Sequence, residues 1–174
     1  QWLSQNSGGD PEKNKSQWQR FTLVSDGGTY VAPVGEMKKL VDSGQASYVY
    51  IYQNGHGAGE MAQKAMYCAY EQNKYWGVHD LLMSANGYNL INNTVKNDKA
   101  KSQELADFLK PAADSGKLKS CLDSGKYDDR IAADMELAKS LGIGGTPGFF
   151  VNNKNFAGAY SFKEMESAVA EALK

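Results

Sequence analysis

The hydrophobic pattern of this chain changes in kind along its 174 residues. Residues 48–52 and 148–152 are rich in β-branched and aromatic side chains, which is typical of buried strands. From about Gly59 to Gly142, in contrast, apolar residues recur at helical spacing. With 41% apolar residues, a chain of this length can bury a substantial core. The pattern therefore predicts an α/β protein in which a block of helices separates two strand-bearing ends.

The first strand-bearing end has the pattern of a βαβ unit. Residues 20–25 are expected to form one strand and residues 48–52 another. Between them, Pro33 fits the first turn of a helix, where its missing N–H group is not needed. Gly44 is expected to end that helix, since glycine readily adopts the left-handed conformation found there.

The other end predicts two strands and a helix. Residues 148–152 form the first strand, residues 153–155 a tight turn and residues 156–158 the second strand. Ser161 then caps a helix, with Glu164 three residues later as its partner in a capping box.

The helical block between them contains several recognisable segments. Asn86 and Gly87 are expected to form a turn, because this dipeptide favours turns. Helices are expected at residues 102–109, 118–123 and 131–141, the last of them ended by Gly142.

Charge and spacing argue against several classes of function. A net charge of −1 and a pI near 6.2 come without a basic stripe, so we expect no nucleic-acid partner. No apolar run approaches the roughly 18 residues that a membrane span needs. His56, Cys68, His79 and Cys121 lack the close paired spacing of zinc ligands, so neither a metal nor a cofactor is expected.

Three segments resemble the DsbA-like family of thioredoxin-fold proteins, the thiol:disulfide interchange proteins. They are residues 68–76 followed by His79-Asp80, residues 121–127, and residues 142–147. The resemblance covers about residues 18–174 and implies an α/β, thioredoxin-like fold with a helical insertion. It places the thioredoxin-like domain at residues 17–57 and 142–174 and the inserted helical subdomain at residues 58–141. Residues 1–16 are polar and are interpreted as a flexible leader.

The chain departs from this family at the position of its catalytic Cys-x-x-Cys motif. Thr29, Tyr30, Val31 and Ala32 occupy that position. In the family, the first cysteine lies at a helix N-terminus, which favours its reactive thiolate. A threonine hydroxyl does not ionise near neutral pH, and the alanine side chain has no polar atom. Thr29 and Ala32 therefore cannot exchange disulfides.

Thr29 has two other interpretations. We expect it to cap the following helix, since threonine is a common N-cap residue. The alternative, a hydroxyl nucleophile, would need an adjacent base, and neither His56 nor His79 has a suitable spacing.

Thr146 and Pro147 resemble the cis-proline loop of the family. In thioredoxin-like proteins this loop lies beside the active-site helix, and its backbone can pair with an extended polypeptide. The resemblance therefore implies a peptide-binding groove formed by Tyr30, Val31, Thr146 and Pro147. The alternative is that Pro147 only shapes a turn before the following strand.

The resemblance also implies a role for the two cysteines, Cys68 and Cys121. Some members of the family carry a second, non-catalytic disulfide in the helical insertion, and these positions match it. Two buried free thiols and a relocated redox pair are the alternatives.

The leading hypothesis is a redox-inactive member of the family that binds extended or unfolded polypeptide, as a chaperone-like module. The family implies a bacterial, extracytoplasmic setting: periplasmic, secreted or on the outer face of a membrane. A membrane tether before Gln1 is compatible with the sequence. Two rivals remain: an oxidoreductase that uses Cys68 and Cys121 or a partner's thiols, and a structural assembly subunit.

Overall fold

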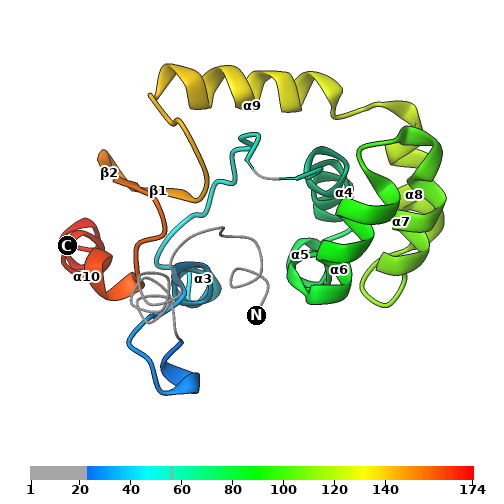
Figure 1. Cartoon of the computed structure of the whole chain (residues 1–174). Coiled ribbons are helices and arrows are strands. Elements are labelled where there is room, and N and C mark those ends of the chain that lie inside the picture. The colour runs from blue at the N-terminus through cyan, green and yellow to red at the C-terminus, as the bar shows by residue number, and fades with distance from the viewer. Residues whose placement is uncertain (1–22, 56) are drawn as a thin grey trace, which may run out of the picture. The chain divides into compact units, whose positions relative to one another are not determined.

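A computed structural model describes residues 23–55 and 57–174, which form two compact units (Figure 1). The first unit contains the described residues up to Val49 together with Gly148–Lys174, and the second is Tyr50–Pro147. The leader expected at residues 1–16 lies outside the described residues. The first unit contains a hairpin, a 3-10 turn and two α-helices, whereas the described part of the second unit is helical.

In the first unit, strands β1 (Gly148–Val151) and β2 (Lys154–Ala157) pair in antiparallel fashion. Gly148 lies opposite Ala157 and Val151 opposite Lys154, so the connecting turn has only two residues. The hairpin was predicted, but its turn lies earlier than expected. Asn152, with φ of 51°, takes the left-handed conformation that asparagine tolerates better than most residues.

Helix α3 (Pro33–Asp42) begins and ends where the sequence predicts. Pro33 occupies its first position, and Gly44 follows its end with φ of 73°. The N–H of Gly44 donates to Val41 O at 2.9 Å, and the N–H of Gln45 donates to Leu40 O at 2.9 Å. These two bonds form a Schellman motif, which satisfies carbonyls that the helix itself leaves unpaired.

Helix α10 (Phe162–Ala172) begins with the predicted capping box of Ser161 and Glu164. The Ser161 hydroxyl also accepts the N–H of Val31 at 3.0 Å, and the N–H of Phe162 donates to Val31 O at 2.8 Å. Ser161 therefore joins two parts of the unit that lie 130 residues apart.

Replacing Ser161 by alanine is expected to lower the free energy of unfolding by about 1–2 kcal/mol, because both the cap and the bond to Val31 are lost. Denaturant unfolding measures this change. Ser167→Ala, at an exposed position of the same helix, is the control and should change stability by less than about 0.5 kcal/mol. Equal effects of the two substitutions would contradict the assigned role of Ser161.

The strand expected at residues 20–25 is wrong in its described part. Leu23 makes only an isolated parallel bridge to Tyr30, and Val24–Asp26 is a 3-10 turn, η1. The N–H of Asp26 folds back onto Leu23 O at 2.9 Å, and Gly27 follows with φ of 80°. Local turn bonds thus replace the ladder that the apolar run predicts.

The strand expected at residues 48–52 is also wrong: in the described structure these residues belong to no sheet. The N–H of Tyr52 donates to the side chain of Asp134 at 3.2 Å. A carboxylate, not a neighbouring strand, therefore satisfies this buried backbone group. The apolar character of the segment is still used, because Tyr52 is buried and Tyr50 packs against the helical core.

In the second unit, helix α7 has the predicted bounds, and two other predicted helices each begin three residues earlier than expected. For one of these, α8, Asp114 supplies the N-cap by accepting the N–H of Lys117 at 2.9 Å. The segments are α4 (Glu60–Tyr70), α5 (Tyr75–Met83), α6 (Ala85–Asn89), the π-helix η2 (Leu90–Val95), η3 (Lys99–Lys101), α7 (Ser102–Leu109), α8 (Ser115–Ser124) and α9 (Asp128–Ser140).

The turn expected at Asn86 and Gly87 is instead part of helix α6. Ser84 caps this helix by accepting the N–H of Gly87 at 3.1 Å. A Cβ atom on Gly87 would collide with the carbonyl oxygens of Leu81 and Leu82. The glycine thus allows the backbone of α6 to lie close to the end of α5, which a turn propensity does not anticipate.

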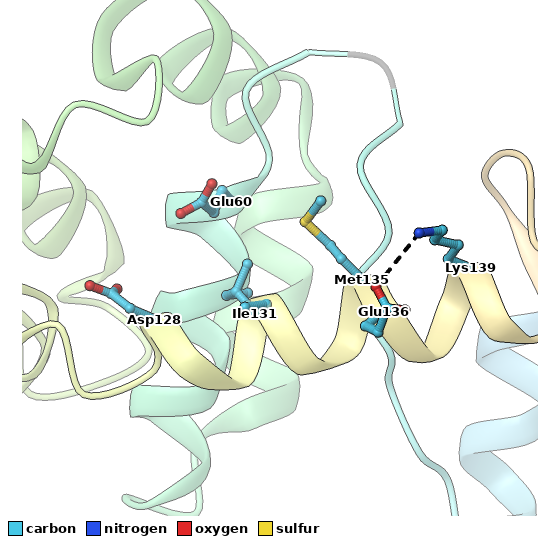
Figure 2. A pocket seen from close by; sticks show the side chains of 7 residues that line it. Glu60, Asp128, Ile131, Met135, Glu136 and Lys139 are labelled. Carbon is cyan, nitrogen blue, oxygen red and sulfur yellow. Dashed lines mark ion pairs between the residues drawn. The ribbon is translucent and has the colours of Figure 1, made fainter.

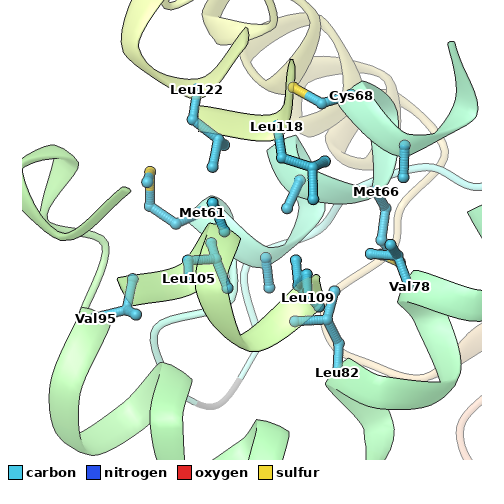
Figure 3. Packing of buried hydrophobic residues seen from close by; sticks show 14 of the residues in the cluster. Met61, Met66, Cys68, Val78, Leu82, Val95, Leu105, Leu109, Leu118 and Leu122 are labelled. Atoms are coloured by element: carbon cyan, nitrogen blue, oxygen red, sulfur yellow. The ribbon is translucent and has the colours of Figure 1, made fainter. Parts of the chain in front are cut away.

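One hydrophobic core holds the second unit together, and Figure 3 shows most of its side chains. Its members come from α4, α5, η2, α7 and α8. Of the helices described, none is both long and apolar enough to cross a membrane. The core residues are Met61, Ala62, Ala65, Met66, Cys68, Ala69, Val78, Leu82, Ile91, Val95, Leu105, Ala106, Leu109, Leu118 and Leu122.

Candidate functional site

The four residues expected at the degenerate catalytic position form the approach to α3. Ala32 is the N-cap of the helix, and Thr29 lies in a bend before it. The expectation that Thr29 caps the helix is therefore wrong, and the N-cap residue Ala32 provides no side-chain bond. With neither a thiol nor a base at this position, the approach to α3 has no group suited to nucleophilic attack.

Tyr30 and Val31 are held within the first unit by their backbones. The N–H of Val24 donates to Tyr30 O at 3.1 Å, and Val31 bonds to Ser161 and Phe162 as described above. Val31 therefore has no backbone group left for an incoming strand, so a peptide would meet this residue through its side chain only.

Thr146 and Pro147 end the second unit, and the bond between them is cis. Both residues are exposed. To the other described residues, the backbone of Thr146 makes no hydrogen bond. An exposed N–H and C=O without a protein partner are what an added strand requires. The four predicted peptide-binding residues are thus divided between the units, and a groove that uses all of them stays a prediction.

The direction of this loop is fixed at the end of α9. Gly142, with φ of 70°, donates its N–H to Lys139 O at 3.0 Å, and the N–H of Ile143 donates to Ala138 O at 2.9 Å. This is again a Schellman motif, so the predicted role of Gly142 is confirmed.

Thr146 also lies against Gly55 within the same unit. A Cβ atom on Gly55 would collide with Thr146 Oγ1 and would approach the Thr146 Cβ to 3.3 Å. Glycine at position 55 therefore allows the two segments to meet closely.

Cys68 and Cys121 are joined in a disulfide that links α4 to α8, with their Cα atoms 6.0 Å apart. Cys68 is only 2% exposed and belongs to the hydrophobic core, against which Cys121 also packs. A buried disulfide sulfur is poorly accessible to an attacking thiolate. This placement favours a structural bond over a redox pair.

A polar cluster that the sequence analysis missed is centred on Asp134 of α9. This side chain is 3% exposed and accepts three bonds: from the Tyr52 N–H, from the Tyr67 hydroxyl, and from Arg130 Nε at 2.7 Å. Burial, followed by the bond to Asp134, raises the pKa of Tyr67 well above its usual value, so the hydroxyl keeps its proton. The only sequence signal was an acidic residue one helical turn after Arg130.

A shallow groove between α4 and α9 is shown in Figure 2. Two of its acidic residues, Glu60 and Asp128, bind the same ammonium group of Lys64 at 2.6 Å and 2.7 Å. Its third, Glu136, faces Lys139 at 4.0 Å. The acidic side chains of the groove are therefore compensated by lysines, and one of these ion pairs, Lys64–Asp128, connects α4 to α9.

Within the described residues, no group of three or more histidine, cysteine or acidic side chains is placed so that it could hold a metal ion. His79 instead contacts Asp80, with Nδ1 to Oδ1 at 3.0 Å. His56 lies outside the described part of the chain.

Comparison with known proteins identifies the family. Residues 34–171 match the thioredoxin family. The chain is also 30% identical over 143 residues to the Na(+)/H(+) antiporter NhaA 3 of Salinispora tropica, covering 77% of this chain and 20% of that protein. It is 26% identical over 119 residues to the Na(+)/H(+) antiporter NhaA 1 of Salinispora arenicola, covering 68% of this chain and 17% of that protein. The chain thus spans about a fifth of the length of the curated relatives it matches. With most of its length matched, the chain is a member of the thioredoxin family and has an α/β, thioredoxin-like fold.

Proposed function

We propose that this thioredoxin-family protein binds extended polypeptide through the backbone of Thr146 and does not catalyse thiol-disulfide exchange. The observation that carries the proposal is the exposed peptide unit of Thr146, which lacks a hydrogen-bond partner among the described residues. An extended chain can satisfy both of its groups by adding a strand. Such binding needs no cysteine.

The lack of redox activity follows from where the sulfur atoms are. The chain has two cysteines, and they are bonded to each other in the second unit (residues 50–147), which we call the helical unit. The residues before α3 provide Thr29 and Ala32, neither of which forms a thiolate.

We assign the chain to the DsbA-like branch, as a member without its Cys-x-x-Cys motif. The disulfide inside a helical insertion supports this assignment.

The same disulfide supports a location outside the cytoplasm. Disulfides persist in oxidising compartments and are rare where cellular reductants keep thiols reduced. The proposed setting is the bacterial periplasm, the medium or the outer face of a membrane. There, a chaperone-like module would meet unfolded polypeptide.

Peptide binding is tested by titrating ¹⁵N-labelled protein with an unfolded model peptide and with the same peptide N-methylated at every residue. We expect the Thr146 amide signal to shift with the first peptide. The N-methylated peptide should bind at least tenfold more weakly, because it cannot donate to Thr146 O. Equal binding of both peptides, or shifts that leave Thr146 unaffected, would refute strand addition at this residue.

The absence of redox catalysis is tested separately, by following dithiol oxidation and insulin reduction. We expect rates equal to those of buffer alone. Turnover that disappears in Cys68→Ala would instead establish the oxidoreductase alternative, with its active site relocated to the helical unit.

A second candidate function, an assembly subunit, is favoured by the comparisons. Both antiporters contain a segment similar to most of this chain. We propose as the alternative that the domain associates with a membrane transporter. The test adds this chain to purified NhaA 3 from which the matching segment has been deleted, and measures complex formation by light scattering. A defined complex together with no peptide affinity would favour assembly over polypeptide binding.

A further inference from the structure

We infer that Asp134 is a positioning residue for the Thr146 peptide unit, and that the Tyr67–Asp134 bond sets the peptide affinity of the loop. This inference rests on the proposed function, because it names a residue that acts through the same site. It concerns the helical unit alone, within which every contact used below lies.

Asp134 joins three segments at one buried point. It projects from α9, receives the Tyr67 hydroxyl from α4, and receives the backbone N–H of Tyr52 from the segment that precedes α4. Arg130, on the same helix, balances its charge. A buried carboxylate with satisfied bonds is a firm anchor, since losing a partner leaves a costly unpaired group.

Two chain segments run from this anchor to the loop. The first runs from Tyr52 to Gly55, which is only three residues away. The second runs along α9 to Gly142, where the Schellman motif fixes the direction in which the chain continues to Thr146.

The two segments meet again where Thr146 lies against Gly55, with no room for a side chain on the glycine. Asp134, Gly55 and Thr146 are thus points on one closed circuit of contacts. A change at Asp134 alters the position of α9 relative to residues 52–55 and is transmitted to the Thr146 peptide unit. The Tyr67 hydroxyl, which donates to Asp134, also lies 3.4 Å from Tyr50 O, so the Tyr67–Asp134 pair connects α9 to the backbone of both Tyr50 and Tyr52.

Tyr67→Phe tests the inference: it removes the hydroxyl that bonds Asp134 and Tyr50 O, while Asp134 keeps its other two partners. We expect the amide signals of Gly55 and Thr146 to shift in the free protein, and peptide affinity to fall about fivefold, the equivalent of one hydrogen bond. The matched control is Tyr127→Phe, which removes a hydroxyl that also bonds a carboxylate, that of Glu71, in the same unit. It should leave both signals and the affinity unchanged.

Gly55→Ala tests the other end of the circuit. Because φ at Gly55 is not in the left-handed region, alanine acts here only through its contact with Thr146. We expect a loss of peptide affinity of at least tenfold, most of which is recovered when Thr146→Ala is added to Gly55→Ala. Recovery in the double variant is something that general destabilisation would not produce.

The free-protein spectra separate this inference from the proposed function. If the wild type binds no peptide, the proposed function fails, yet Tyr67→Phe still decides the positioning role through the Gly55 and Thr146 signals. If Tyr67→Phe leaves those signals where Tyr127→Phe leaves them, or if Thr146→Ala fails to relieve Gly55→Ala, the positioning role of Asp134 is overturned.

Discussion

Replacing both Cys68 and Cys121 by alanine is expected to lower the free energy of unfolding of the helical unit by about 4 kcal/mol. The disulfide closes a loop whose ends are 53 residues apart in sequence. Without it, the unfolded chain gains the conformational freedom that this loop closure removes. A smaller contribution comes from Cys68 itself, which is buried in the core and loses packing when the sulfur is removed.

The measurement is urea unfolding of the double variant and of the wild type, followed by helical circular dichroism. Wild-type protein treated with a reductant provides a second comparison, since it lacks the bond but keeps both sulfur atoms. We expect most of the loss in the reduced protein, because the loop constraint dominates. A reduced protein as stable as the oxidised one would show that the bond contributes little, and would reopen the redox interpretation of this pair.

Several helix boundaries and caps could be predicted from local signals. The α7 bounds and the end of α9 at Gly142 follow from apolar spacing and from glycine chemistry, which act within a few residues. The capping box of Ser161 and Glu164 is equally local. Such features depend little on the rest of the chain, so the sequence carries them directly.

Features that depend on distant partners could not be predicted. Residues 48–52 have the composition of a strand, but the decisive bond is made by Asp134, 82 residues from Tyr52. The error at Thr29 is local instead: threonine has the chemistry of a cap, but α3 begins at Pro33 and has Ala32 as its N-cap. For the candidate site, resemblance placed the Thr146 loop, whereas its support by Gly55 and Asp134 appears only once the chain is folded.

Leu109→Ala is expected to lower the free energy of unfolding of the helical unit by about 3 kcal/mol. Leu109 is fully buried in the core that α7 forms with α4 and α8. Truncation removes apolar contacts and leaves a cavity, which close packing on all sides prevents from collapsing. Leu137→Ala on α9 is the matched control: its side chain is 44% exposed, so a change below about 0.5 kcal/mol is expected.

Hydrogen exchange of the same two variants locates the effect. In Leu109→Ala, the amides of α4, α7 and α8 should exchange faster by a factor that corresponds to the lost stability, about 150-fold for 3 kcal/mol. The core and the disulfide restrain the same helices, because Cys68 belongs to that core and Cys121 packs against it. Combining Leu109→Ala with the loss of the disulfide therefore tests whether their effects add. If the combined loss of stability is close to the sum of the two separate losses, about 7 kcal/mol, the disulfide acts on the unfolded chain. A combined loss much smaller than this sum means that the disulfide acts through core packing.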